Sequence, residues 1–205
     1  MKKNNHEFNI LICGTGGQGL ITLLQIIAEA ALNEGYEVRT SELHGLSQRG
    51  GSVEVHIRFG KKIYSPLIAK GKADLILALE MQESLRTVNF VSSKTVFLIN
   101  KQIIPIPLEK QLTEKEVLTN LKKFIPKQSF GDTKGQAKKV EIIPAAEICE
   151  KNLGTNVVSG IYLLSLASFR GILPLKPDSI LNSIKKIIPE KYLELNIKTF
   201  NLAKS

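Results

Sequence analysis

Residues 8–19 read FNILICGTGGQG, an apolar run that ends in a glycine-rich turn. The run Phe8–Cys13 is almost continuously apolar, as in a parallel strand that is covered on both faces. After the turn, apolar residues recur at three- and four-residue spacing from Leu20 to Leu32, and Gly35 follows. That spacing predicts a helix that packs back on the sheet and stops at the glycine. The stretch therefore predicts the strand–turn–helix start of an α/β fold.

The remaining patterns extend this architecture. A second strand at 36–41 would complete a right-handed βαβ unit. Alternation at 52–59 predicts a strand with one wet face, and residues 60–62 read as a hairpin turn into a strand at 63–65. Strands are also predicted at 74–79, 95–99 and 140–143, with a helical stretch at 82–90. Prolines limit 103–107 to an edge strand or an extended connection. The region 127–138 reads as a mobile loop, and helices at 156–169 and from 177 to 188 follow.

Together these patterns predict an α/β, Rossmann-like three-layer fold. Its sheet would be mostly parallel with one antiparallel hairpin, and its C-terminal region would be helical. With 205 residues, 43% of them hydrophobic, the chain is expected to fold as a single domain over 1–205. The helix at 156–169 is apolar around its whole circumference, so it should be buried against the sheet or in a subunit interface.

Composition limits the cellular location, the cysteine chemistry and the partners that can be expected of this chain. No apolar run approaches a membrane span, and residues 1–7 lack a secretory signal, which predicts a cytoplasmic protein without membrane attachment. Cys13 and Cys149 have no CxxC spacing and are interpreted as buried thiols. The net charge is +9, and residues 101–205 carry 17 basic and 10 acidic side chains. That surface could steer nucleic acid, an acidic subunit or an acidic electron carrier, or could simply be a solvated face.

Two loops should meet at the carboxyl edge of the sheet, where open α/β proteins hold ligands or partners. The first loop is Gly14–Gly19, in which glycines allow a tight turn and the Gln18 amide can read a polar group; close strand–helix packing is the alternative. The second is Leu43–Gly51, in which Arg49 can bind a carboxylate or phosphate, or can fix its own loop. The candidate residues are Gly14, Gly16, Gly17, Gln18, Gly19, Glu42, His44, Gln48, Arg49, Gly50 and Gly51.

Three functional interpretations use these features. In an NAD(P)-binding dehydrogenase or regulatory domain, Gly14, Gly16 and Gly19 would receive the dinucleotide phosphates and Glu42 would bind ribose hydroxyls, with His44 as an acid. A basic nucleic-acid-binding protein is disfavoured, because the chain has no tryptophan, 6% aromatic residues and no reader motif. The third interpretation comes from a resemblance to a known family.

The motifs GxGGQG at 14–19, Glu42–Gly45, Gln48–Ser52, Tyr64–Ile68, Gly71–Leu75 and Leu79–Glu80 resemble the gamma-type domain of the 2-oxoacid:ferredoxin oxidoreductase family. Within it, they are similar to the small subunits of the indolepyruvate branch. Residues Asn100, Asn156, Asn196 and Phe200 fit the same pattern, whereas 101–138 match only loosely.

The resemblance implies a subunit of a complex that oxidatively decarboxylates aryl pyruvates to acyl-CoA and passes electrons to ferredoxin. Such complexes use thiamine diphosphate, Mg²⁺, [4Fe–4S] clusters and coenzyme A. Two isolated cysteines cannot ligate a four-cysteine cluster, and no thiamine-binding Gly-Asp-Gly segment with its downstream asparagine is present. The resemblance therefore implies that this chain has no catalytic residue, metal or cofactor of its own and is inactive alone. A large thiamine- and iron–sulfur-binding partner would hold the cofactors, with Gly16, Gly17, Gln18 and Arg49 at its coenzyme A entrance.

Overall fold

The computed structural model describes residues 7–45, 51–105, 111–124 and 140–204. Its strands are β1 (Phe8–Thr15), β2 (Glu37–His44), β3 (Ser52–Gly60), β4 (Leu75–Ala78), β5 (Val96–Asn100) and β6 (Val140–Ile143). Its helices are α1 (Leu20–Asn33), the 3₁₀ helix η1 (Glu83–Phe90), α2 (Glu114–Phe124), α3 (Ala145–Leu153), α4 (Ser159–Phe169), α5 (Pro177–Ile187) and α6 (Glu190–Leu202).

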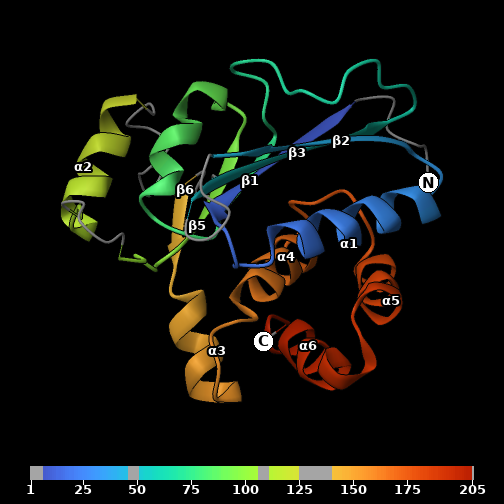
Figure 1. Cartoon of the computed structure of the whole chain (residues 1–205). Helices are drawn as coiled ribbons and strands as arrows, with labels where there is room; N and C mark the ends of the chain where they lie inside the picture. Colours follow the sequence, from blue (N-terminus) through green and yellow to red (C-terminus); the bar gives the residue numbers. More distant parts are fainter. Residues whose placement is uncertain (1–6, 46–50, 106–110, 125–139, 205) are drawn as a thin grey trace.

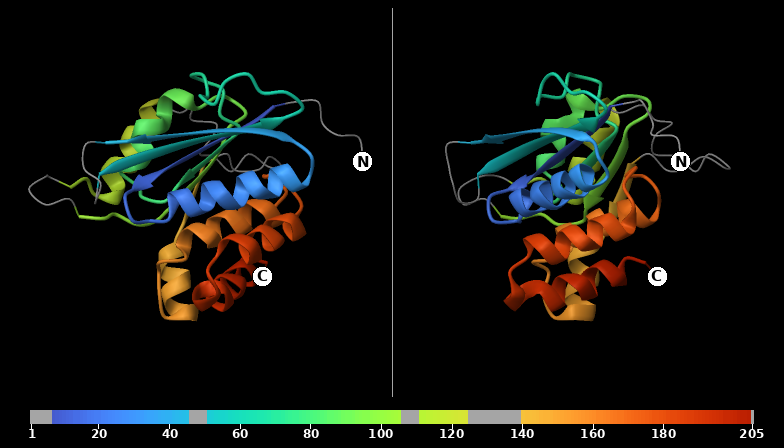
Figure 2. Two further views of the ribbon diagram at one scale, coloured as in Figure 1. Left: turned by 45° about the vertical axis from the view of Figure 1, so that its right-hand side comes forward. Right: turned by 90° about the vertical axis from the view of Figure 1, so that its right-hand side faces the viewer.

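The six strands form one mixed sheet in the order β2-β3-β1-β4-β5-β6. The strands β1, β4, β5 and β6 run parallel, and β3 is antiparallel to both β1 and β2. Helices α1 and α4 lie against one face and η1 and α2 against the other, with α3, α5 and α6 further out (Figures 1 and 2). The predicted three-layer α/β class with a helical C-terminal region is confirmed.

Alternation along the strands gives the sheet two cores. In β1, Ile10 and Ile12 belong to the core beneath α1, α4 and α5, whereas Leu11 and Cys13 belong to the core beneath η1 and α2. Since side chains in a strand alternate between faces, a run that is apolar throughout is buried on both. The apolar helix predicted at 156–169 is α4. Nine of its eleven residues are buried, and it contacts α1, α3, α5 and α6 within this chain.

The predicted βαβ unit is modified by an inserted strand. β1 and β2 have the same direction, but β3 lies between them and pairs with both. The antiparallel hairpin is therefore β2–β3, closed by the second loop. The prediction of a hairpin into 63–65 was wrong, because no strand forms there. Instead, residues 61–73 fold over the η1 face of the sheet and bury Ile63 and Ile68.

Three further predictions are corrected or left open by the structure. The second face of β3 is not wet, because His56 on it is only 2% exposed beneath the 61–73 segment. Residues 103–105 form an extended connection rather than an edge strand, and the loop predicted at 127–138 lies outside the described residues. Helix α2 was not predicted. Its signal is the capping box Thr113–Glu116, in which the Thr113 N–H donates to the Glu116 carboxylate at 2.7 Å.

Candidate functional site

The first glycine loop and the described ends of the second loop lie together at the carboxyl edge of the sheet, as predicted. The Gly16 N–H donates to the Gly51 carbonyl at 2.9 Å, and Gly45 N–H donates to the Ser52 carbonyl at 3.0 Å. These bonds continue the β1–β3 and β2–β3 ladders to the base of the second loop. Residues 46–50, which include Gln48, Arg49 and Gly50, lie outside the described part of the chain. The structure thus brings the first loop against Gly51 and leaves the role of Arg49 as a prediction.

The Gln18 side chain is engaged within the chain at both of its polar ends. Its Oε1 accepts the Thr15 N–H at 2.8 Å, and its Nε2 donates to the Leu79 carbonyl at 3.1 Å. Gly14 is required for this arrangement, because a Cβ there would lie 2.6 Å from Gln18 Oε1 and 3.2 Å from Leu79 Cβ. Gly17 and Gly19 have φ angles of 103° and 78°, which favour glycine. The loop residues therefore first serve the close packing of β1, α1 and β4.

The crevice between β1 and β4 is the switch point of the sheet, where connections leave in opposite directions. Two amides fill it. Asn100, fully buried at the end of β5, donates to the same Leu79 carbonyl at 3.1 Å, and its Oδ1 accepts the Ala146 N–H at 3.1 Å. A dinucleotide fold keeps this crevice open for its pyrophosphate. Here both amides hydrogen-bond to the carbonyl of Leu79, the residue that follows β4, so their donors are engaged within the chain.

Glu42 and His44 lie on the exposed edge strand β2. Their side chains face each other, with His44 Nε2 and Glu42 Oε2 3.3 Å apart. Because β3 separates β2 from β1, Glu42 lies two strand spacings, roughly 10 Å, from the strand that carries the glycine loop. The inserted strand therefore weakens the dinucleotide interpretation, which needs the acidic residue next to the first strand.

Buried carboxylates beneath the second loop were missed by sequence reasoning. Glu83 accepts a hydrogen bond from the Ser52 hydroxyl and pairs with Arg86 Nε at 3.1 Å. Glu80, 1% exposed, accepts the N–H groups of Glu83 at 2.8 Å and Ile104 at 3.2 Å. Burial raises the pKa of Glu80, against the opposing effect of these N–H donors. The cluster ties Ser52, at the start of β3, to η1. Its sequence signals were the family motif Leu79–Glu80 and the acidic residues at 80 and 83 after an apolar strand.

The cysteines are buried, as predicted, and lie on different elements, Cys13 on β1 and Cys149 on α3. Burial raises the pKa of Cys13 well above its usual value, and the carboxylates of Glu83 and Glu54 raise it further. Burial also raises the pKa of Cys149 to about 11. Both thiols are therefore protonated at neutral pH, whereas iron and zinc bind thiolates. Within the described ranges no three His, Cys, Asp or Glu side chains are grouped to hold a metal ion.

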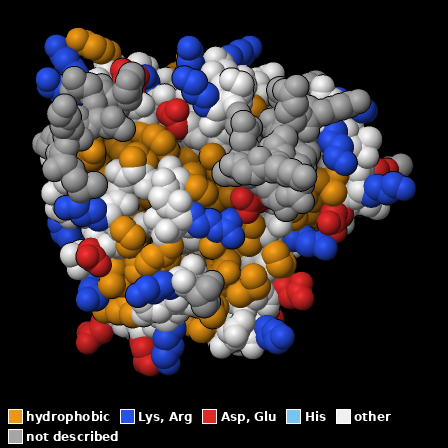
Figure 3. Space-filling view, turned by 180° about the vertical axis from the view of Figure 1, so that it is seen from behind, with side chains coloured by type: hydrophobic (Ala, Val, Ile, Leu, Met, Phe, Trp, Pro, Cys, Tyr) orange, Lys and Arg blue, Asp and Glu red, His pale blue; other side chains and the backbone are white. Residues whose placement is uncertain are grey.

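A cavity of about 740 Å³ opens beside the first loop, between the start of α1, the start of α4 and the α5–α6 junction. Its walls are mainly apolar, and the described residues that line it include no charged side chain. The lining residues include Gly19, Leu23, Val157, Ile161, Ile188 and Tyr192. Val157 and Tyr192 are 76% and 51% exposed, so the cavity has an apolar rim. Seen from behind, the molecule shows hydrophobic side chains gathered over much of its lower half (Figure 3).

Residues 9–205 match the family described as Pyruvate ferredoxin/flavodoxin oxidoreductase. The chain therefore belongs to this family of oxidoreductase subunits. Among its relatives, it is 36% identical to the indolepyruvate oxidoreductase subunit IorB of Archaeoglobus fulgidus, over 96% of this chain and 93% of that protein. It is 34% identical to the IorB subunit of Thermococcus kodakarensis, over 96% and 94% of the two chains.

Solved structures share the fold. The pyruvate oxidoreductase subunit PORC of Thermotoga maritima superimposes with a TM-score of 0.66 at 19% identity, covering 99% of this chain and 96% of that one. A 2-oxoglutarate:ferredoxin oxidoreductase from Magnetococcus marinus, with 2-oxoglutarate, coenzyme A and succinyl-CoA bound, gives 0.67 at 18% identity. The alignment covers all of this chain but 31% of that longer one. Among the described residues, no helix is long and apolar enough to cross a membrane.

Proposed function

We propose that this chain is the small subunit of an indolepyruvate ferredoxin oxidoreductase, which oxidatively decarboxylates aryl pyruvates to acyl-CoA in the cytoplasm. The observation that carries the proposal is the similarity to IorB subunits over 96% of the chain at 34–36% identity. The family match over residues 9–205 supports the same reaction class. The whole chain takes part as a single domain.

The chain contributes shape rather than cofactor chemistry. It has only two cysteines, and these lie on separate elements, so they do not fit a four-cysteine iron–sulfur cluster. The Gln18 and Asn100 side chains at the switch point both donate to the Leu79 carbonyl, so these amides are engaged within the chain rather than free to bind a diphosphate. Thiamine diphosphate, Mg²⁺ and [4Fe–4S] clusters would therefore be held by a large partner subunit, and ferredoxin would receive the electrons through that complex.

The loop edge is the surface we assign to the large subunit. Gly16 and Gly17 present backbone without side chains at this edge. The Gln18 side chain holds the turn through its hydrogen bonds with the Thr15 N–H and the Leu79 carbonyl. A preformed loop loses little conformational entropy on binding, which favours its use in an interface. In this arrangement Gly16, Gly17, Gln18 and Arg49 border the path that coenzyme A takes to the partner's cofactor.

Coexpression with a large, thiamine-dependent subunit of an indolepyruvate oxidoreductase tests the proposal. The purified pair should reduce ferredoxin or methyl viologen when given indolepyruvate and coenzyme A, and this chain alone should show no activity. Failure to associate with a thiamine-dependent partner, or substrate oxidation by the isolated chain, would contradict it.

A matched pair of variants tests the coenzyme A path. Arg49→Ala should raise the KM for coenzyme A without loss of the partner, whereas Lys151→Ala, on the exposed surface of α3, should leave it unchanged. An Arg49→Ala complex with wild-type coenzyme A dependence would remove the second loop from this path.

A further inference from the structure

The apolar cavity beside the first loop is walled by the starts of three helices. Gly19, Val158 and Pro189 are the N-cap residues of α1, α4 and α6, and all three line the cavity. Helices more often begin at Ser, Thr, Asp or Asn, whose side chains accept a hydrogen bond from the first turn. These three N-caps add no hydroxyl or carboxylate to the walls. The cavity is therefore suited to an occupant with apolar side chains.

The helix starts also favour an occupant that carries hydrogen-bond acceptors. The first-turn N–H groups of a helix have no partner within the helix, and at these three N-caps no side chain accepts a hydrogen bond. A polypeptide segment brings backbone carbonyl oxygens together with apolar side chains. A segment of another protein chain thus matches both properties of the cavity.

The rim of the cavity indicates an occupant larger than the cavity itself. Val157 and Tyr192 line it, yet their exposed fractions are 76% and 51%. A small molecule inside the cavity would leave these two side chains in water, whereas a protein surface laid over the cavity covers them as well. Exposed apolar surface that is gathered in one place marks protein–protein contacts. The cavity and its rim therefore fit a protein partner.

The walls of the cavity are held together within this chain. Gly160 lets α4 approach α1 closely, because a Cβ at this position would lie 3.0 Å from Leu23 Cδ1. The ion pair between Lys186 Nζ and Glu29 Oε1, at 2.6 Å, joins α5 to α1. A cavity that is formed before the partner arrives costs little conformational entropy on binding.

The position of the cavity identifies the partner. Gln18 and Gly19 of the first glycine loop are among its lining residues, so the cavity and the loop edge form one continuous surface. A partner that covers the loop edge therefore reaches the cavity. A second copy of this chain is less suitable, because a two-fold contact places the same surface on both sides. A cavity at the centre of such a contact would face another cavity and stay unfilled.

We propose that the large subunit inserts an apolar segment into this cavity, with Val157 and Tyr192 packed against that segment at the rim. The inference rests on the proposed function, which supplies the large subunit. A few residues in well-packed, desolvated pockets carry most of the binding energy of an interface. The cavity is thus the anchor of the complex, and it holds the first loop against the same partner.

Competition for the large subunit tests the proposal. A tagged large, thiamine-dependent subunit is coexpressed with wild-type chain and one variant at equal levels, and mass spectrometry measures the ratio of the two chains in the purified complex. Tyr192→Ala and Val157→Lys should each be retained at least about tenfold less than wild type. Both side chains are exposed, so the isolated variants should unfold at the same urea concentration as wild type.

Tyr64→Ala is the matched control. Tyr64 is 80% exposed, but it lies on the segment 61–73 at the end of the sheet opposite to the glycine loops. Its retention should stay within about twofold of wild type. Wild-type retention of the two cavity variants in an active complex would overturn the docking site, and so would an equal loss of Tyr64→Ala.

Two further outcomes separate this proposal from its alternatives. If the isolated chain formed a dimer that Tyr192→Ala dissolved, with retention by the large subunit unchanged, the cavity would belong to a second copy and the proposal would be wrong. If the large subunit retained no wild-type chain, the proposed function itself would be contradicted, and the docking site with it.

Discussion

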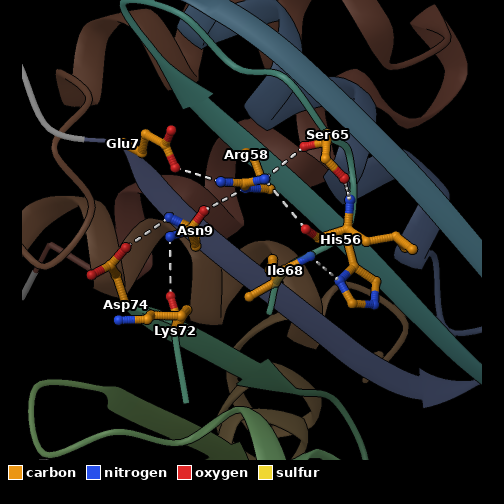
Figure 4. A network of polar contacts seen from close by, with 9 residues as sticks. Glu7, Asn9, His56, Arg58, Ser65, Ile68, Lys72 and Asp74 are labelled. Atoms are coloured by element: carbon orange, nitrogen blue, oxygen red, sulfur yellow. Dashed lines mark hydrogen bonds and ion pairs between the residues drawn. The ribbon is translucent and has the colours of Figure 1, made fainter. Parts of the chain in front are cut away.

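The two ends of the sheet fix their loops with different chemistry. At the carboxyl end, neutral amides from Gln18 and Asn100 converge on the Leu79 carbonyl. At the opposite end, the Arg58 guanidinium joins Glu7, Asn9 and the segment 61–73 in a charged network, and Asp74 accepts the Asn9 N–H at 2.8 Å (Figure 4). Neutral amides can fill a dry crevice at low cost, whereas charged groups need access to water. The first end is therefore suited to packing and the second to an exposed, charged surface.

The largest effect is expected at the buried amide end. Asn100→Ala should destabilise the chain by about 2–4 kcal/mol, because it leaves a cavity and a buried Ala146 N–H without its acceptor. Chemical denaturation of the isolated chain measures this value. Asn100→Asp retains an acceptor for the Ala146 N–H but loses the donor to the Leu79 carbonyl. If its free energy of unfolding falls as much as that of Asn100→Ala, burial of the carboxylate charge outweighs the retained acceptor.

Next in size is the effect of filling the space at Gly14. Gly14→Ala should cost about 1–3 kcal/mol, because the new Cβ must displace the Gln18 amide and press on Leu79. Gly45→Ala is the matched control, since a Cβ there lies no closer than 3.5 Å to its neighbours. If urea titrations gave the two variants equal stability, the packing around Gly14 would be no closer than the packing around Gly45.

A smaller loss is expected at the charged end. Arg58→Lys should cost about 1–2 kcal/mol, because one ammonium cannot replace the guanidinium that binds Asn9 and two loop carbonyls together. Hydrogen exchange should then report faster exchange of the Leu67 and Ile68 amides, with β4 and β5 unchanged. Uniform protection across residues 61–73 in this variant would mean that the buried side chains of Ile63 and Ile68 suffice to hold the segment.

The smallest effect is the pH dependence from Glu80. Its pKa is raised by burial, so the folded state binds a proton that the unfolded state releases as pH rises above the usual value of 4.5. The contribution of Glu80 to the free energy of unfolding is therefore fully present below pH 4.5 and is lost as pH rises through the folded pKa. Denaturation of wild type and Glu80→Gln between pH 4 and 8 should show this loss only in wild type; parallel profiles would contradict it.

Local patterns predicted much of this fold because they report burial directly. Continuous apolar runs located β1, β4, β5 and β6, and three- and four-residue spacing located α1 and α5. Residues 63–65 misled the same reasoning, since Ile63 and Ile68 are buried as loop anchors and not as strand residues. The wet face expected on β3 was also wrong, because the segment that covers His56 comes from later in the chain.

The sequence predicted the position of the candidate site better than it predicted the contacts within the site. The spacing of Gly14, Gly16 and Gly19 after an apolar run placed the first loop at a strand end, and the motifs placed the chain in its family. The engagement of Gln18 with Leu79 and the Ser52–Glu83 bond join residues 61 and 31 positions apart. A single sequence carries no local signal for such contacts, so the buried carboxylates beneath the second loop were not foreseen.

By itself, the sequence determined which segments are buried, where glycine permits the turns, and which family the motifs indicate, since these depend on hydrophobicity, backbone freedom and short-range order. Only the tertiary structure decided that β3 enters between β1 and β2, that two amides converge on the Leu79 carbonyl, and that Arg58 binds the segment 61–73. Strand order and long-range hydrogen bonds depend on the sum of many distant contacts, each of which is weak in any local pattern.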